Sequence, residues 1–119
     1  MRQTFAHEAQ VHMGVDEDDR ALGGAVTLAL CGSWEHEPPC PLAPHHSSVR
    51  RDGEVVVLRV LFAVDGDREA EVRALIEASL SAGEQVTPEG AVVRWRLLRS
   101  TAGEVKPAES ALAQRLVDS

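Results

Sequence analysis

The chain of 119 residues has 44% hydrophobic residues, 26% charged residues and a net charge of -7. This composition is typical of one soluble globular domain spanning residues 1–119, and it excludes collagenous, transmembrane and largely disordered classes. The negative charge and the 3% of aromatic residues argue against nucleic-acid binding, because such proteins neutralise phosphates with Lys and Arg and stack bases on aromatic rings.

No targeting or membrane-spanning segment is expected. The only long apolar run, residues 21–31, is too short to cross a bilayer and follows an acidic stretch instead of a basic one. We therefore expect a cytoplasmic protein. In a reducing compartment its two cysteines should be thiols or metal ligands, because two cysteines do not make a disulfide framework in a chain of this size.

The first element predicted is a half-buried strand over residues 4–13, where apolar and polar residues alternate. The apolar side holds Phe5, Ala9, Val11 and Met13, and the polar side holds Glu8, Gln10 and His12. His7 falls on the apolar side, where a hydrogen-bonded core histidine is favoured over a ligand. An acidic connection over residues 14–20 leads to a second predicted strand, residues 24–34, and a short loop between alternating strands favours an antiparallel hairpin.

The strongest predicted strand covers residues 54–64, and its most apolar face carries Val56, Leu58, Val60, Phe62 and Val64. Asp67 is a suitable N-cap for the helix that follows, and Gly83 is a suitable C-cap. Apolar residues recur at helical spacing between these caps. A further strand is predicted over residues 91–100, and a last helix begins near Pro107.

These elements predict an α+β two-layer sandwich, with chain order βββαβα, a mainly antiparallel four-stranded sheet and two helices on one face. The other sheet face would then be too apolar to lie bare in water, so it favours a homodimer interface or a ligand pocket. That face combines apolar side chains with arginines: Val55, Val57, Leu61, Val92, Leu98, Arg59, Arg94 and Arg96. Arg50, Arg51 and the strand arginines suit an anionic small molecule, and pairing with acids of the same sheet is an equally good explanation.

The connection over residues 31–46, CGSWEHEPPCPLAPHH, is the preferred candidate site. It holds both cysteines and three histidines, and thiolates and imidazoles are the ligands that zinc and copper favour. The predicted metal ligands are Cys31, His36, Cys40 and His45. Their gaps of four, three and four residues differ from zinc signatures, and adjacent His45 and His46 point apart in an extended chain.

Two alternatives stay open for this connection. Cys40 is a candidate thiol nucleophile or redox sensor, activated by His36 or His45, or it pairs with Cys31 in a reversible disulfide. In the other alternative the prolines only stiffen the connection, and the protein acts through its exposed sheet face as a non-catalytic homodimerisation or interaction module. Phosphate-binding glycine loops, HExxH motifs and nucleophile elbows are absent from the sequence, so metal or small-ligand binding is favoured over catalysis.

Overall fold

A computed structural model describes residues 1–32 and 43–119. The elements in chain order are β1 (Arg2–His12), α1 (Arg20–Cys31), β2 (His45–Asp52), β3 (Val55–Asp65), the 3-10 turn η1 (Gly66–Arg68), α2 (Glu69–Ser81), β4 (Glu84–Val86), β5 (Val92–Arg94), β6 (Arg96–Gly103), the 3-10 turn η2 (Pro107–Glu109) and α3 (Ser110–Val117).

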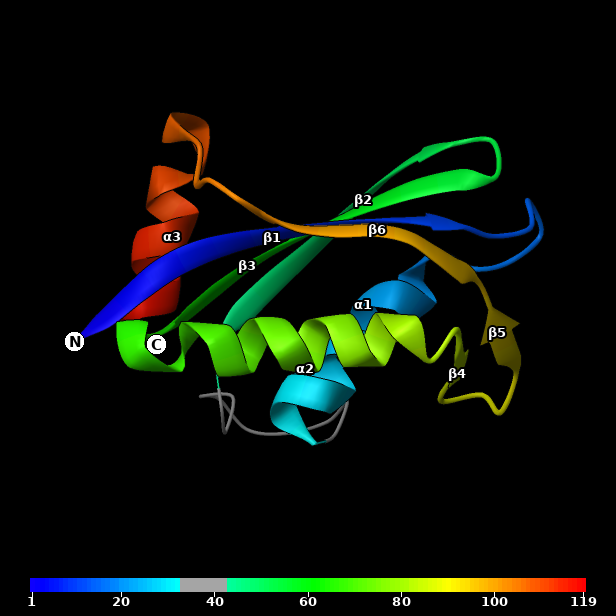
Figure 1. The fold of residues 1–119 in the computed structure, drawn as a ribbon, viewed down its shortest axis with the longest axis horizontal. Helices are drawn as coiled ribbons and strands as arrows, with labels where there is room; N and C mark the ends of the chain where they lie inside the picture. Colours follow the sequence, from blue (N-terminus) through cyan, green and yellow to red (C-terminus); the bar gives the residue numbers. More distant parts are fainter. Residues whose placement is uncertain (33–42) are drawn as a thin grey trace.

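The main sheet has four antiparallel strands in the order β2-β3-β1-β6. With α1 and α2 as the crossovers, the chain follows the split βαβ arrangement of ferredoxin-like folds. The short β4–β5 hairpin is inserted before β6, and α3 follows the last strand (Figure 1). The predicted α+β class with a four-stranded antiparallel sheet is confirmed.

The predicted strand over residues 24–34 is wrong, because residues Arg20–Cys31 form the helix α1. Its buried side chains recur at helical spacing, at Leu22, Val26 and Leu30. A short apolar run fits both periodicities, and here the burial of this stripe against α2 and the sheet decides for the helix. Gly32 ends α1 with a left-handed φ of 75°, a conformation in which glycine avoids the steric penalty of a Cβ atom.

The sheet strand that takes the place of the wrongly predicted one is β2. It begins within the proline-rich connection, at His45, and continues beyond it to Asp52. It pairs with β3 through a hairpin that turns at Gly53, where φ is 61°. The predicted strand over residues 91–100 is broken at Trp95, whose indole N–H donates to the Leu80 carbonyl oxygen at 2.8 Å. That bond ties the end of α2 to the point where the chain leaves the β4–β5 hairpin and enters β6.

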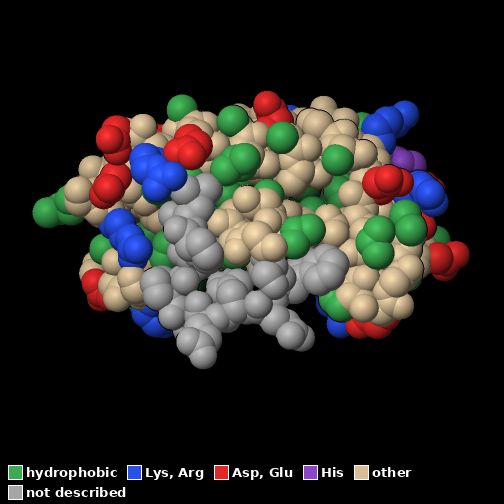
Figure 2. Space-filling view, turned by 90° about the horizontal axis from the view of Figure 1, so that it is seen from below, with side chains coloured by type: hydrophobic (Ala, Val, Ile, Leu, Met, Phe, Trp, Pro, Cys, Tyr) green, Lys and Arg blue, Asp and Glu red, His purple; other side chains and the backbone are tan. Residues whose placement is uncertain are grey.

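The main core lies between the sheet and the helices α1 and α2. Odd-numbered residues of β1 and even-numbered residues of β3 face these helices, in keeping with the alternation of a strand. The largest fully buried side chains are Phe62, Met13, Leu22, Leu58, Ile76 and Leu80. On the helical side, which Figure 2 shows, acidic and basic side chains lie next to one another at both ends of the molecule.

Helix α3 packs on the opposite face, so the prediction that it shares a face with the preceding helix is wrong. Its Leu116 and Leu112 contact Ala6, Leu61 and Ala63 in a second, smaller core. These sheet residues lie at the end of the sheet near the chain termini, where Figure 1 shows α3. Part of the second sheet face is therefore covered by α3, and the part lined by Gln10, Val57 and Arg99 is open. Within residues 1–32 and 43–119, no helix is long and apolar enough to cross a membrane.

Candidate functional site

The structure brings together two of the four predicted metal ligands. Cys31 ends α1 and His45 begins β2, and the Cys31 Sγ and His45 Nδ1 atoms lie 3.9 Å apart. His36 and Cys40 lie outside the described residues. The His45 ring also has Nδ1 3.1 Å from the Ala43 carbonyl oxygen and Nε2 3.0 Å from the Thr27 hydroxyl. Because a carbonyl only accepts, Nδ1 is the donor in the contact with Ala43.

The metal site stays a prediction. Among the described residues, no group of three His, Cys, Asp or Glu side chains is placed to hold a metal ion. The Cys31 sulfur is disulfide-bonded in this structure. A thiolate is the form of cysteine that coordinates metals, so the metal interpretation applies to the reduced protein.

His7 lies in a buried polar cluster between β1, β6 and α2, which confirms it as a hydrogen-bonded core histidine. Only 5% of its surface is exposed. Arg73 Nη1 lies 3.0 Å from His7 Nδ1 and donates to the Ala6 carbonyl oxygen at 2.7 Å, while His7 Nε2 lies 2.8 Å from the Ser100 hydroxyl. Burial, and after it the charge of Arg73, lowers the pKa of His7, against a smaller opposing effect of Glu77.

The His7 and Ser100 pair does not have the polarity of a nucleophile and its base. Arg73 is always a donor, so His7 Nδ1 must accept and Nε2 must carry the hydrogen. That hydrogen is donated to Ser100, whereas a base that activates a serine has to accept the hydroxyl proton at the same nitrogen. The cluster thus positions α2 against the sheet and supplies no catalytic dyad.

We expect His7 to make the protein less stable as the pH falls below about 6.5, the ordinary pKa of histidine. The unfolded chain takes up a proton there, while the folded chain resists it until the pH reaches the lowered pKa of His7. The free energy of unfolding should therefore fall between pH 7.5 and pH 5, by at most about 1.4 kcal/mol per pH unit from this group.

Urea unfolding of the wild type and of His7→Gln across this range measures the effect. The variant should be less stable at pH 7.5 and should show a smaller pH dependence than the wild type. Equal slopes in the two proteins would show that His7 does not cause the change.

The open part of the second sheet face is organised in rows that run across all four strands. One row consists of Arg50, Val57, Gln10 and Arg99, one residue from each strand in the order β2-β3-β1-β6. The next row consists of Ser48, Arg59, Glu8 and Thr101. Because alternate residues of a strand point to the same side, both rows face away from α1 and α2.

Arg59 lies between the part of this face that α3 covers and the part that is open. Its guanidinium makes two hydrogen bonds with Glu109, at 2.8 and 2.7 Å, and one with Glu8 at 2.9 Å. The hydrogen bond from Arg59 is the main cause that lowers the pKa of Glu109 to about 2. Arg59 thereby fixes the start of α3 on the sheet.

The predicted apolar and arginine-bearing face is thus only partly exposed. Leu61 is buried under α3 and Arg59 is paired with acids, so neither belongs to a bare surface. Val92 and Arg94 lie in the separate β4–β5 hairpin. What remains of the predicted set near the open face of the main sheet is Val55, Val57, Arg96 and Leu98.

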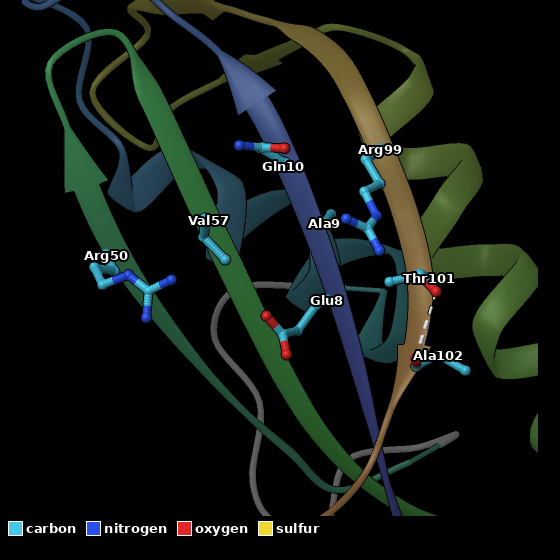
Figure 3. Close-up of a pocket in the computed structure, with 8 residues that line it drawn as sticks. All are labelled: Glu8, Ala9, Gln10, Arg50, Val57, Arg99, Thr101 and Ala102. Atoms are coloured by element: carbon cyan, nitrogen blue, oxygen red, sulfur yellow. Dashed lines mark hydrogen bonds between the residues drawn. The ribbon is translucent and has the colours of Figure 1, made fainter.

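The first row, together with Glu8 and Thr101 of the second, lines a groove of about 420 Å³ (Figure 3). Figure 3 shows Glu8 in the middle of this groove, with Arg50 on one side and Arg99 on the other. Neither of these two arginines makes a hydrogen bond or ion pair with any residue in the described part of the chain. The remaining lining residues are Ala9, Gln10, Val57, Thr101 and Ala102.

Two residues of the acidic connection before α1, Glu17 and Asp19, are tied to β2 through Arg51. Arg51 contacts Asp19 at 3.5 Å and donates to the Glu17 carbonyl oxygen at 2.9 Å. Asp18 pairs with Arg20 at 2.8 Å. The arginines that neutralise these acids are therefore not available for a ligand, in contrast to Arg50 and Arg99.

Comparisons with known proteins leave the function open. No protein-family model matches the chain, and no curated protein matches it in sequence. One solved structure that resembles it is the aminobenzoyl-glutamate utilization protein from Klebsiella pneumoniae, with 11% sequence identity and a TM-score of 0.35. The similar region covers 90% of this chain and 30% of that protein. A likeness this distant carries no functional argument.

The sequence indicates Arg50 as an anion ligand but does not indicate Arg99, Gln10 and Glu8 as its neighbours. No sequence motif joins them, because they come from three different strands. The alternation of β1 does place Glu8 and Gln10 on the polar side of the strand. This is the sequence signal for polar residues in the groove. Bringing Arg99 next to Gln10 requires the pairing of β1 with β6.

Proposed function

We propose that this protein is a non-catalytic module that binds a small anionic ligand in the groove on the open sheet face. The supporting observation is that Arg50 and Arg99 line one groove and neither has a partner among the described residues. Guanidinium groups recognise carboxylates and phosphates through paired hydrogen bonds, and such charge-assisted bonds are about twice as strong as neutral ones.

The distribution of unpaired arginines supports this proposal. In the described residues, four arginine side chains have no hydrogen-bond or ion-pair partner: Arg50, Arg96, Arg99 and Arg115. The first three lie on or beside the open sheet face. Arg50 and Arg99 line the groove, and Arg96 lies opposite His12 in the register of β1 and β6, so its side chain points to the same side of the sheet. In a chain with a net charge of -7, this is a local concentration of available positive charge.

A panel of anions tests the proposal with a readout that locates the site. Inorganic phosphate, hexanoate and adipate are titrated into 15N-labelled protein, and at least one should shift the amide signals of Gln10, Val57 and Arg99. Arg50→Gln and Arg99→Gln should each weaken that binding by about tenfold, the loss of one charge-assisted pair. Arg115→Gln is the matched control, because it removes an unpaired arginine outside the groove.

Two results would contradict the proposal. The first is that none of the three anions shifts groove signals at tens of millimolar. The second is that Arg115→Gln weakens binding as much as the groove variants, which would mean that the anions respond only to net charge.

A homodimer through the same face remains a second proposal. Val55 and Val57 are the half-buried apolar residues that such an interface would cover. The groove also holds the carboxylate of Glu8 and two alanines, Ala9 and Ala102, and Glu and Ala are depleted from protein interfaces. Light scattering coupled to size-exclusion chromatography measures the mass directly, and a monomer would remove this proposal without affecting ligand binding.

A metal site formed by the reduced protein is a third proposal, favoured by the approach of Cys31 to His45. Zinc or copper would need ligands beyond these two, and His36 and Cys40 are the residues that the sequence offers. Elemental analysis of reduced, tag-free protein tests this proposal, and a His45→Ala variant should lose any ion that is bound.

A further inference from the structure

We infer that the ligand of the groove is an elongated molecule with an acidic group at each end. This inference rests on the proposed function and adds the class of ligand. Its basis is the arrangement of charge across the sheet, where positive side chains lie on the two outer strands and a negative one lies between them.

The register of the sheet fixes the two positive ends. Arg50 lies on β2, Arg99 lies on β6, and they end the same cross-strand row. Adjacent strands are about 4.8 Å apart, so three spacings place the two Cα atoms about 14 Å apart. Figure 3 shows the two guanidinium groups on opposite sides of Glu8, so each is placed to bind an acidic group of its own.

The middle of the groove disfavours a third negative charge. Glu8 lies there, as Figure 3 shows, and its Oε2 atom is held by Arg59 at 2.9 Å. A central anion would be repelled by this carboxylate, whereas a ligand with charge only at its ends places neutral atoms beside it. Val57 supplies an apolar surface for a spacer, and the Gln10 amide offers a donor and an acceptor to a polar group within it.

The same spacing indicates the length of the ligand. A guanidinium bound to a carboxylate by two hydrogen bonds takes up about 4 Å between the carbon atoms of the two groups. The Cα atoms of the two arginines lie about 14 Å apart, so the guanidinium groups at the ends of their side chains can reach the two carboxylates of a linear six-carbon diacid. Adipate is therefore the probe, and hexanoate is the matched monoanion with the same number of carbons.

Calorimetric and NMR titrations of both acids into the full chain test the inference. Wild-type protein should bind adipate at least about tenfold more tightly than hexanoate, because the second acidic group binds as part of an already bound molecule. Arg50→Gln and Arg99→Gln should each reduce adipate affinity to that of hexanoate. Arg115→Gln should leave the preference unchanged, and amide spectra of each variant verify that it is folded.

The possible failures are distinguishable. Equal affinities for adipate, hexanoate and phosphate would overturn recognition at two ends while leaving the proposed anion site in place. Loss of adipate binding in only one of the two arginine variants would do the same. If none of these anions shifts the groove signals, both the inference and the proposed function fail.

Discussion

Replacing Arg59 by methionine is expected to lower the free energy of unfolding by about 2–3 kcal/mol. The side chain is 13% exposed and is the shared partner of Glu8 and Glu109. Methionine can fill part of the volume, but it leaves Glu8 and Glu109 without the cation that they share. Arg59 is mostly buried, so its pairs are screened less by solvent than those at the surface.

The position of Arg59 predicts where the loss appears first. Glu109 directly precedes α3, whose buried contacts with the sheet are few, so the variant should release this helix before the rest of the fold. Amide hydrogen exchange should accelerate more in α3 than in β1 and β3. Chemical denaturation gives the total loss, and Arg68→Met, which removes an exposed pair with Glu71, should leave the free energy of unfolding nearly unchanged.

The same contact has a pH dependence of known sign. The pKa of Glu109 is lowered to about 2, so its carboxylate stabilises the folded state above the ordinary pKa of 4.5, and this contribution is lost as the pH falls toward 2. Arg59→Met should therefore lose part of the acid sensitivity of the wild type below pH 4.5. An unchanged acid profile together with unchanged exchange in α3 would contradict the role assigned to Arg59.

Phe62→Ala is expected to have the largest effect on stability, a loss of about 3–5 kcal/mol. The side chain is fully buried in the main core. Its ring centroid lies 5.6 Å from that of Phe5, and the Arg73 guanidinium carbon lies 5.3 Å from the Phe62 centroid. The substitution therefore creates a cavity and removes an aromatic contact and a cation–π contact together.

Thermal and urea unfolding measure this loss, and Leu98→Ala is its control. Leu98 is a large apolar residue that is 45% exposed on β6, so its truncation should cost less than about 1 kcal/mol. A loss below about 2 kcal/mol for Phe62→Ala would show that the surrounding side chains collapse into the cavity, and that Phe62 is not central to the core.

Local periodicity predicts the elements whose buried face is long and regular. The strand over residues 54–64 and the helix that ends at Gly83 are present close to the predicted bounds, as Val55–Asp65 and Glu69–Ser81. Both have one apolar face that recurs at a single period, so only one secondary structure buries it. The core position of His7 follows from the same alternation in β1.

Residues 21–31 show where local periodicity is insufficient. Their small and apolar side chains satisfy the period of a strand as well as that of a helix, and only packing against α2 and the sheet distinguishes the two. The position of α3 is also undetermined by local periodicity, because its short apolar stripe fits either face of the sheet. Because α3 covers Leu61, the face predicted to be bare contains a small core under α3 and an open groove beside it.

The amino-acid sequence by itself determined the α+β class, the main apolar strand and the polar side of β1, because these depend on residues close together in the chain. Only the tertiary structure decided which side chains share a site. Strand pairing across the order β2-β3-β1-β6 places Arg50, Gln10 and Arg99 in one row, although Gln10 and Arg99 are far apart in the chain. The register of distant strands depends on the fit of the whole core, and this is why the groove cannot be predicted from local patterns.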